Sequence, residues 1–184
     1  MTTVVAGGDS FIWGSELKDS PHGGPFGWSN NTFTALLSQN YRYCCAAYPG
    51  YGNRDIAKNV ILCCEEFNPN VVMVCWTWPG RDDRLDSDDV IQSLQDYLEF
   101  HEHRYMFTCA DNCVITGQLN YNNWFMFPPA IEEWNTTEPR GFYQWAAETK
   151  YECGPDQHPL ETAHRDAAKL IQGRFNELVK KSVQ

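Results

Sequence analysis

The sequence predicts an α/β protein, a three-layer α/β/α sandwich with a parallel sheet of about five strands. Strand-like and helix-like segments alternate along the chain with short connections, which is typical of parallel strands joined by right-handed crossovers. The run 71–76 is continuously apolar without alternation, as in a central strand covered on both faces. The helices are therefore expected to flank the sheet on both sides.

The first strand is expected at residues 4–8, where an apolar run ends in two glycines and leads Ser10 onto a strand-to-helix turn. A Gly- and Pro-rich loop follows, and Asn30 or Asn31 is a good N-cap for a helix through Leu37. Residues 41–48 are expected as the second strand. After a turn rich in Pro and Gly, residues 54–67 have apolar side chains at helical spacing.

Two more helices and a fourth strand are expected in the second half of the chain. Residues 86–104 begin with a capping acid and carry an apolar face, and residues 113–117 read as a short strand. Residues 160–181 form the last helix, with a cationic end. The region 120–151 is the least regular and rich in aromatic residues, and it is expected to form a lid or a pocket wall.

Length and charge limit the function classes. A chain of 184 residues is expected to form one domain, residues 1–184. The net charge of -10 argues against a nucleic-acid partner, because phosphate binding needs clustered Lys and Arg. The chain begins directly with strand-like residues and has no apolar run of membrane-spanning length. We therefore expect a soluble, cytoplasmic protein without a membrane partner.

The eight cysteines do not read as a disulfide scaffold, because several of them lie inside apolar stretches and are expected to be reduced core residues. A zinc site is not expected, since there is no C-x-x-C pair. His101 and His103 would point to nearly opposite sides of a helix and would not converge on one metal ion.

Two distant segments together offer the groups of a hydrolytic site. Ser10 is expected at the carboxyl edge of the sheet, beside the free N–H groups of the following helix. Asp156 and His158 lie in the loop before the last helix, so the two termini supply a nucleophile, a base and an orienting carboxylate. The simpler roles are a helix cap for Ser10 and a loop residue for His158. Asp9 is expected to cap the first helix.

These residues resemble the sequence blocks of the SGNH (GDSL-type) hydrolases. The matching segments are Gly8-Asp9-Ser10, the glycine turn after the second strand and Asp156-Gln157-His158-Pro159. The compact form, with a G-D-S-F opening, is similar to members encoded by bacteriophages, which would place the protein in a host cytoplasm or a virion. The resemblance implies a flavodoxin-like fold and an esterase that cleaves an acyl or acetyl ester, including one on a glycan, without a cofactor.

The resemblance also implies residue roles. Ser10 would attack the ester carbonyl, His158 would take its proton and return it to the leaving alcohol, and Asp156 would hold the imidazole. The backbone N–H groups of Ser10 and of Gly50 or Gly52 would donate to the oxyanion.

The chain departs from the family pattern at two places. A G-x-N-D block normally follows the third strand, but residues 76–81 read Trp-Thr-Trp-Pro-Gly-Arg and lack the asparagine that completes the oxyanion hole. The Thr77 hydroxyl, the Trp78 indole and the Asn53 amide are alternative donors. One residue instead of two separates Asp156 from His158, so Asp156 either orients the ring or only shapes the turn.

Trp78, Arg81 and Trp124 are candidate substrate-binding residues. The tryptophans offer apolar surface, and Arg81 offers a contact for an anionic group. The simpler roles are core packing for the aromatic cluster that includes Trp124 and a solvated ion pair for Arg81. A missing oxyanion donor costs about 3 kcal/mol, or roughly a hundredfold in rate. The alternative function is therefore a catalytically weak or inactive protein of this fold, with a binding or virion-associated role.

Overall fold

The computed structural model describes residues 1–20, 27–82, 87–129 and 138–180, and it has one parallel sheet. The strands are β1 (Thr3–Gly7), β2 (Arg42–Cys45), β3 (Val71–Trp76) and β4 (Arg104–Cys109), in the order β2-β1-β3-β4. All three strand pairs are parallel. This order is that of the flavodoxin-like folds, so the predicted architecture is confirmed.

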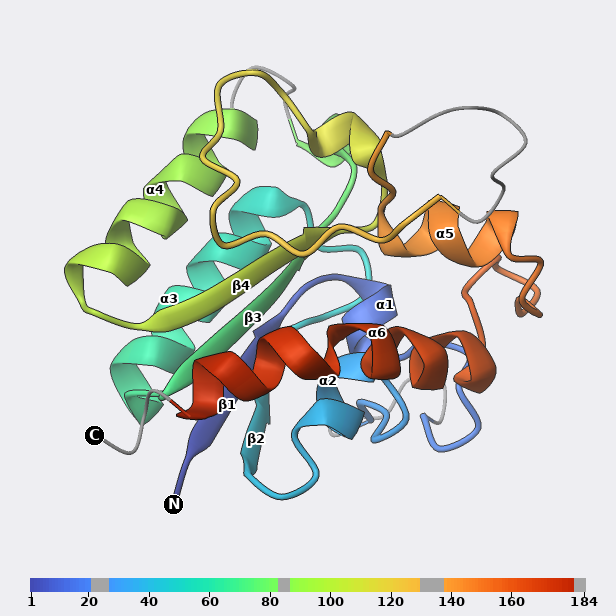
Figure 1. The fold of residues 1–184 in the computed structure, drawn as a ribbon, viewed down its shortest axis with the longest axis horizontal. Coiled ribbons are helices and arrows are strands. Elements are labelled where there is room, and N and C mark those ends of the chain that lie inside the picture. Colours follow the sequence, from blue (N-terminus) through green and yellow to red (C-terminus); the bar gives the residue numbers. More distant parts are fainter. Residues whose placement is uncertain (21–26, 83–86, 130–137, 181–184) are drawn as a thin grey trace.

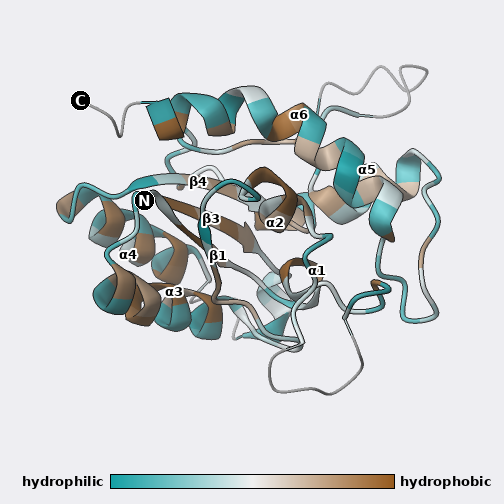
Figure 2. Cartoon of the chain, turned by 90° about the horizontal axis from the view of Figure 1, so that it is seen from below, coloured by the Kyte–Doolittle hydropathy of each residue, from teal (hydrophilic) through white to brown (hydrophobic). Residues whose placement is uncertain are grey.

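Helices cover both faces of the sheet (Figure 2). One face carries α3 (Asn53–Phe67) and α4 (Ser87–Phe100), and the other carries α6 (Glu161–Lys180) with α2 (Phe33–Leu37) and α5 (Phe142–Glu148). Each face has its own apolar cluster, and all six residues of β3 between them are buried. The predicted central strand therefore sits where its continuous apolar run requires.

The expected segments agree with the structure to within a few residues for the first three strands and for α3, α4 and α6. The cap of α2 was predicted one or two residues early, because Thr32 is the N-cap and its hydroxyl accepts a hydrogen bond from the N–H of Ala35 at 3.3 Å. The expected helix limits at residues 86 and 181 lie outside the described residues.

The prediction of the fourth strand was wrong. The chain leaves α4 at Phe100, Glu102 takes a left-handed conformation with φ 56°, and β4 starts at Arg104. The predicted strand at 113–117 begins instead inside a 3-10 helix, η3 (Asn112–Val114). The helix predicted at residues 86–104 runs four residues past the end of α4 and includes the first residue of β4, which hides the start of the strand.

The sheet has four strands within the described residues, instead of about five. A single parallel bridge joins Phe107 of β4 to Trp124, so the following segment lies along the sheet edge for one residue pair only. Further along the region that was expected to be irregular, α5 forms a helix of seven residues.

The first strand turns into α1 (Ser10–Trp13) within two residues (Figure 1). A Cβ atom on Gly8 would come within 2.8 Å of the Cβ of Ile12, so this turn requires a glycine. The helices of the described part of the chain include none that is long and apolar enough to cross a membrane.

Candidate active site

Ser10 lies at the carboxyl end of β1, as the first residue of α1, and only 6% of its surface is exposed. Asp9 is the N-cap of this helix, and its side chain accepts a hydrogen bond from the N–H of Phe11 at 3.0 Å. The predicted capping role of Asp9 is confirmed. The β1 corner, formed by Asp9, Ser10 and Phe11, therefore holds a nearly buried serine at the start of α1.

His158 meets the β1 corner from the other end of the chain. Its imidazole packs edge-on against the ring of Phe11, with ring centroids 5.4 Å apart. Burial raises the pKa of Asp9, and a positive charge on His158 is the smallest of the effects that oppose this shift. Because Phe11 and Asp9 flank Ser10, the structure brings the β1 corner and the loop before α6 together.

The carboxylate beside His158 is Glu16. The Nδ1 atom of His158 lies 2.7 Å from Oε2 of Glu16, and only 16% and 6% of the two side chains are exposed. Glu16 also accepts hydrogen bonds from the backbone N–H groups of Asp156 and His158, at 3.0 to 3.2 Å. One carboxylate thus holds both the imidazole and the loop that carries it.

The expectation that Asp156 orients the imidazole needs correction. The side chain of Asp156 is exposed, and the residue contributes its backbone N–H to Glu16. The short spacing to His158 explains this, because Gln157 adopts a left-handed conformation with φ 65° and its N–H donates to the carbonyl of Gly154. The tight turn directs N–H groups toward Glu16.

Sequence reasoning missed Glu16 because no local motif marks it. Glu16 lies two residues after Gly14, the C-cap of α1, and Glu16 itself has a left-handed φ of 68°. Across the contact, a Cβ atom on Gly154 would lie 2.5 Å from Cδ of Glu16, so this glycine makes room for the carboxylate. Burial alone would raise the pKa of Glu16, but the hydrogen bonds from Asp156 and His158 outweigh it and hold the pKa below its usual value.

The β3 corner, formed by Asn53, Thr77 and Ser87, is closed by its own hydrogen bonds. The Nδ2 group of Asn53 donates to the carbonyl of Thr77 at 3.2 Å and to the hydroxyl of Ser87 at 3.1 Å. The N–H of Thr77 donates back to Oδ1 of Asn53 at 3.0 Å. Both amide hydrogens of Asn53 are therefore used inside the protein.

The hydroxyl of Thr77 also donates its hydrogen to a group of the protein. It donates to Oδ2 of Asp9 at 2.7 Å, and Nη1 of Arg81 lies 3.2 Å from the same oxygen. Burial raises the pKa of Asp9, while Thr77, the N–H of Phe11 and the charge of Arg81 oppose this shift. Thr77 and Asn53 keep no free hydrogen for an oxyanion, so their expected role as donors is not supported by these contacts.

The glycine turn after β2 lies next to the β1 corner, because the N–H of Tyr48 donates to the carbonyl of Gly8 at 3.3 Å. Gly50 has a φ of 85°, which explains the glycine at this position. Gly52 is the N-cap of α3, and a Cβ atom there would lie 2.7 Å from Cγ of Asp82. The turn is thus placed near the serine, as the resemblance implies.

Trp78 and Arg81 lie beside the β1 corner. The ring of Trp78 is 5.7 Å from that of Phe11, and the Arg81 guanidinium lies 5.6 Å from the Trp78 ring centroid. The cation of Arg81 pairs with the buried Asp9, not with a solvated neighbour. Trp78 also lines a cavity of about 400 Å³ together with residues of η1 (Pro79–Arg81), η3 and α4.

Trp124 is not brought to this corner by its described contacts. It packs on Phe107 and Tyr121, in the apolar cluster on the α3 and α4 face. Phe11 belongs to the cluster on the opposite face. A hollow of about 580 Å³ between α3 and α4 likewise includes none of the candidate site residues.

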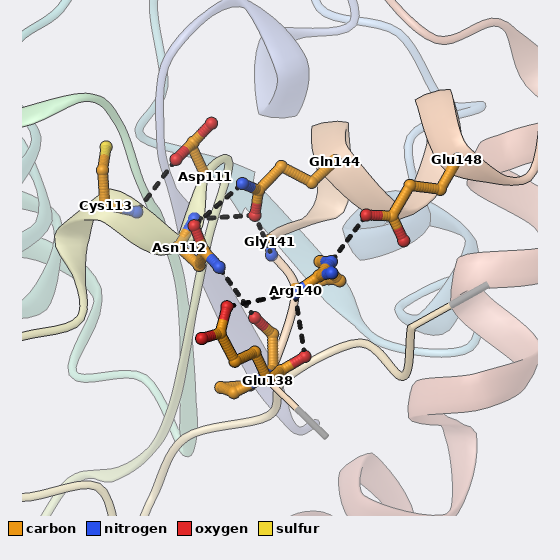
Figure 3. A network of polar contacts seen from close by, with 9 residues as sticks. Asp111, Asn112, Cys113, Glu138, Arg140, Gly141, Gln144 and Glu148 are labelled. Carbon is orange, nitrogen blue, oxygen red and sulfur yellow. Dashed lines mark hydrogen bonds and ion pairs between the residues drawn. The ribbon is translucent and has the colours of Figure 1, made fainter. Parts of the chain in front are cut away.

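A polar network anchors α5 to the loop after β4 (Figure 3). The Gln144 side chain accepts from the N–H of Asn112 at 2.9 Å and donates to its side chain at 2.8 Å. Arg140 is held by Glu148 through a contact of 2.6 Å. This anchoring places Tyr143 against Phe11, with ring centroids 5.9 Å apart.

No family model and no curated protein matches the sequence, but solved structures match its fold. A carbohydrate acetylesterase family member from Sinorhizobium meliloti has a TM-score of 0.56 at 11% identity, over 98% of this chain and 100% of that one. A putative lipolytic protein of the G-D-S-L family from Desulfitobacterium hafniense has a TM-score of 0.51 at 13% identity, over 100% of both chains.

A third similar structure is a carbohydrate esterase whose active site is described as displaying divergent catalytic and non-catalytic binding functions. It has a TM-score of 0.55 at 13% identity, over 95% of this chain and 68% of that one. The chain therefore has the fold of the SGNH (GDSL-type) hydrolases. These matches give no support to the expected similarity to bacteriophage-encoded members.

Proposed function

We propose that this protein is a serine esterase that cleaves an acyl or acetyl ester, including one on a glycan. The observation that carries the proposal is the contact of 2.7 Å between Nδ1 of His158 and Glu16, on an imidazole packed against the residue that follows Ser10. A carboxylate on one imidazole nitrogen leaves the other nitrogen to serve a nearby hydroxyl as a base. The matched esterase structures support the same class of reaction.

In the proposed mechanism, Nε2 of His158 takes the proton of the Ser10 hydroxyl as its oxygen attacks the ester carbonyl. Glu16 stabilises the imidazolium and fixes the tautomer that carries a proton on Nδ1. His158 then returns the proton to the leaving alcohol, and the acyl group stays on Ser10. A water molecule, activated by the same imidazole, hydrolyses this acyl-enzyme.

Backbone groups supply the proposed oxyanion hole. The N–H groups of Ser10 and of Gly50 or Gly52 are the candidates, since the side-chain hydrogens of Thr77 and Asn53 are donated to other protein groups. The indole N–H of Trp78 is the remaining side-chain candidate, because its ring packs beside Phe11. Each such donor typically lowers the activation free energy by about 3 kcal/mol.

Trp78 and Arg81 are the proposed substrate-binding residues. Trp78 joins the β1 corner to the cavity of about 400 Å³, which gives an acyl or alcohol group apolar surface. The Arg81 guanidinium is one-third exposed, and the described contacts use only its Nη1 atom and its face. Its other N–H groups suit a carboxylate or hydroxyl on the substrate.

Hydrolysis of p-nitrophenyl acetate and of O-acetylated glycans tests the proposal. The wild-type protein is expected to release acetate, and Ser10→Ala and His158→Ala are each expected to lose at least about 10³-fold in kcat. Circular dichroism and thermal unfolding show whether each variant is folded. Equal turnover by the wild type and both variants would exclude this site.

A non-catalytic binding function is the second candidate. It is favoured by the closed β3 corner and by the matched carbohydrate esterase that is described as having non-catalytic binding functions. It predicts glycan binding that survives Ser10→Ala, with no hydrolysis by the wild type. Calorimetric titration with acetylated and deacetylated glycans distinguishes the two functions.

A further inference from the structure

Two thiols meet between the edge strand β2 and helix α3, outside the proposed active site. The sulfur atoms of Cys44 and Cys63 are 3.8 Å apart and form a thiol–thiol hydrogen bond. Both residues are only partly buried. The proposed esterase mechanism uses neither of them.

The neighbouring thiols have other surroundings. Cys45 directs its thiol toward the carbonyl of Ile12 at 3.9 Å, and Cys64 is buried. Burial raises the pKa of Cys45 to about 11 and that of Cys64 to about 12, so both stay protonated at neutral pH. In contrast, the hydrogen bond between Cys44 and Cys63 lowers the pKa of Cys44.

We propose that Cys44 and Cys63 are a redox-modification site, which a peroxide oxidises to a reversible disulfide. The proposal rests on the sulfur atoms of two partly buried cysteines, which lie in contact on two elements that the chain joins through the loop at residues 46–52. The proposal does not depend on the proposed esterase function.

The chemistry balances with one peroxide molecule per disulfide. The Cys44 thiolate attacks one peroxide oxygen, the O–O bond breaks, and Cys44 becomes a sulfenic acid while hydroxide leaves. The Cys63 sulfur then attacks the sulfenic sulfur, which forms the S–S bond and expels the second oxygen as water once the Cys63 proton is transferred. Two thiols and one hydrogen peroxide thus give one disulfide and two water molecules.

The required movement is small. A disulfide has a sulfur separation of about 2.05 Å, so the two sulfur atoms must approach by less than about 2 Å. The new bond closes a ring over residues 44–63, which contains Gly50 and Gly52. Oxidation is therefore expected to restrain the glycine turn beside Ser10.

Treatment of the full chain with hydrogen peroxide, followed by thiol blocking and peptide mapping without reduction, tests the proposal. We expect a cross-linked peptide pair that contains Cys44 and Cys63, and its loss after dithiothreitol. The oxidised protein is expected to have a Tm higher by roughly 5–10 °C, because a ring of this length restricts the unfolded chain.

Three variants sharpen this test. Cys44→Ser and Cys63→Ser are expected to show no peroxide-dependent rise in Tm, whereas Cys113→Ser, which removes an exposed thiol, should behave as the wild type. Peptide mapping of the wild type needs no variant, so it decides the matter even if a serine variant fails to fold. A cross-link between other cysteines, or oxidation of Cys44 to a sulfinic acid without a cross-link, would overturn the proposal.

Discussion

The carboxyl edge of the sheet has two polar corners that are organised in opposite ways. At the β1 corner, Glu16 binds Nδ1 of His158, and within the described part of the chain no hydrogen bond uses Nε2 of His158 or the hydroxyl of Ser10. At the β3 corner, the side-chain hydrogens of Asn53 and Thr77 are donated to protein groups. The first corner keeps polar atoms available, and the second uses them for structure.

This difference shows that residue type alone does not assign a role at a site. Asn53, Thr77 and Ser10 all carry side-chain hydrogens at the same sheet edge. Only a count of the hydrogen bonds separates a group that can act on a ligand from one that holds two elements together. Variants of the β1 corner should therefore affect chemistry, and variants of the β3 corner should affect stability.

The largest effect is expected from Glu16→Gln. The amide keeps the shape of the side chain but loses the charge that stabilises the imidazolium and fixes its tautomer. We expect kcat for p-nitrophenyl acetate to fall by about 10³- to 10⁴-fold. Steady-state kinetics measure this, and a loss smaller than tenfold in a folded variant would show that Glu16 does not act on His158.

Asn53→Ala should break the β3 corner instead. It leaves the buried N–H and carbonyl of Thr77 without their partner, so we expect the free energy of unfolding to fall by about 2–4 kcal/mol. The kcat per folded molecule should stay within about threefold of the wild type. Urea unfolding and active-fraction kinetics measure the two quantities.

The opposite result would reverse this assignment. An oxyanion donor typically contributes about 10²- to 10³-fold to kcat. A loss of that size in Asn53→Ala, with unchanged stability, would place Asn53 in the oxyanion hole and make the two corners alike.

A second histidine, His164 of α6, contrasts with the partly exposed His158 because it is fully buried. Nδ1 of the buried His164 accepts a hydrogen bond from the N–H of Phe33 at 3.2 Å. Burial, with a smaller contribution from the charge of His158, lowers the pKa of His164 to about 3. Because the unfolded chain binds this proton near pH 6.5, stability should fall as the pH drops from about 6.5 toward 3, by about 1.4 kcal/mol per pH unit.

His164→Gln should remove this part of the pH dependence, because an amide does not titrate. The exposed His101, changed to Gln, is the matched control and should leave the slope as it is. Urea unfolding between pH 4 and pH 7 measures how the free energy of unfolding of each variant changes with pH. An unchanged slope in His164→Gln would show that His164 is not held in its neutral form.

The smallest effect is expected from Asp156→Ala. The variant keeps the backbone N–H that Glu16 accepts, and its side chain is exposed in the wild type. We expect kcat within about twofold of the wild type, since surface changes of this kind have little effect. A fall comparable to that of Glu16→Gln would restore Asp156 as the orienting carboxylate.

The sequence predicted those parts of the fold that follow from local periodicity and turn chemistry. The apolar run of β3 and the spacing in α3 and α6 identified their elements, and the glycines before Ser10 identified the β1 corner. The start of β4 was missed because the left-handed turn at Glu102 has no glycine to mark it. The order of the sequence blocks led to Ser10 and His158, which the fold brings to one corner.

The rest of the site depends on contacts between distant residues. Glu16 and His158 are 142 positions apart, and neither Glu16 nor its neighbours form a recognisable motif. Asn53 and Thr77 carry suitable hydrogen-bond donors at the carboxyl edge of the sheet, but these donors are used in hydrogen bonds between distant parts of the chain. Trp124 was grouped with Trp78 by composition, and the fold places them in clusters on opposite faces of the sheet.

Peptide-level mass spectrometry after reaction with a fluorophosphonate reports directly whether Ser10 is the nucleophile. We expect a covalent adduct on Ser10, formed at a much lower rate in Glu16→Gln and at an unchanged rate in Asp156→Ala. An adduct on another serine, or equal labelling rates in the wild type and Glu16→Gln, would contradict it.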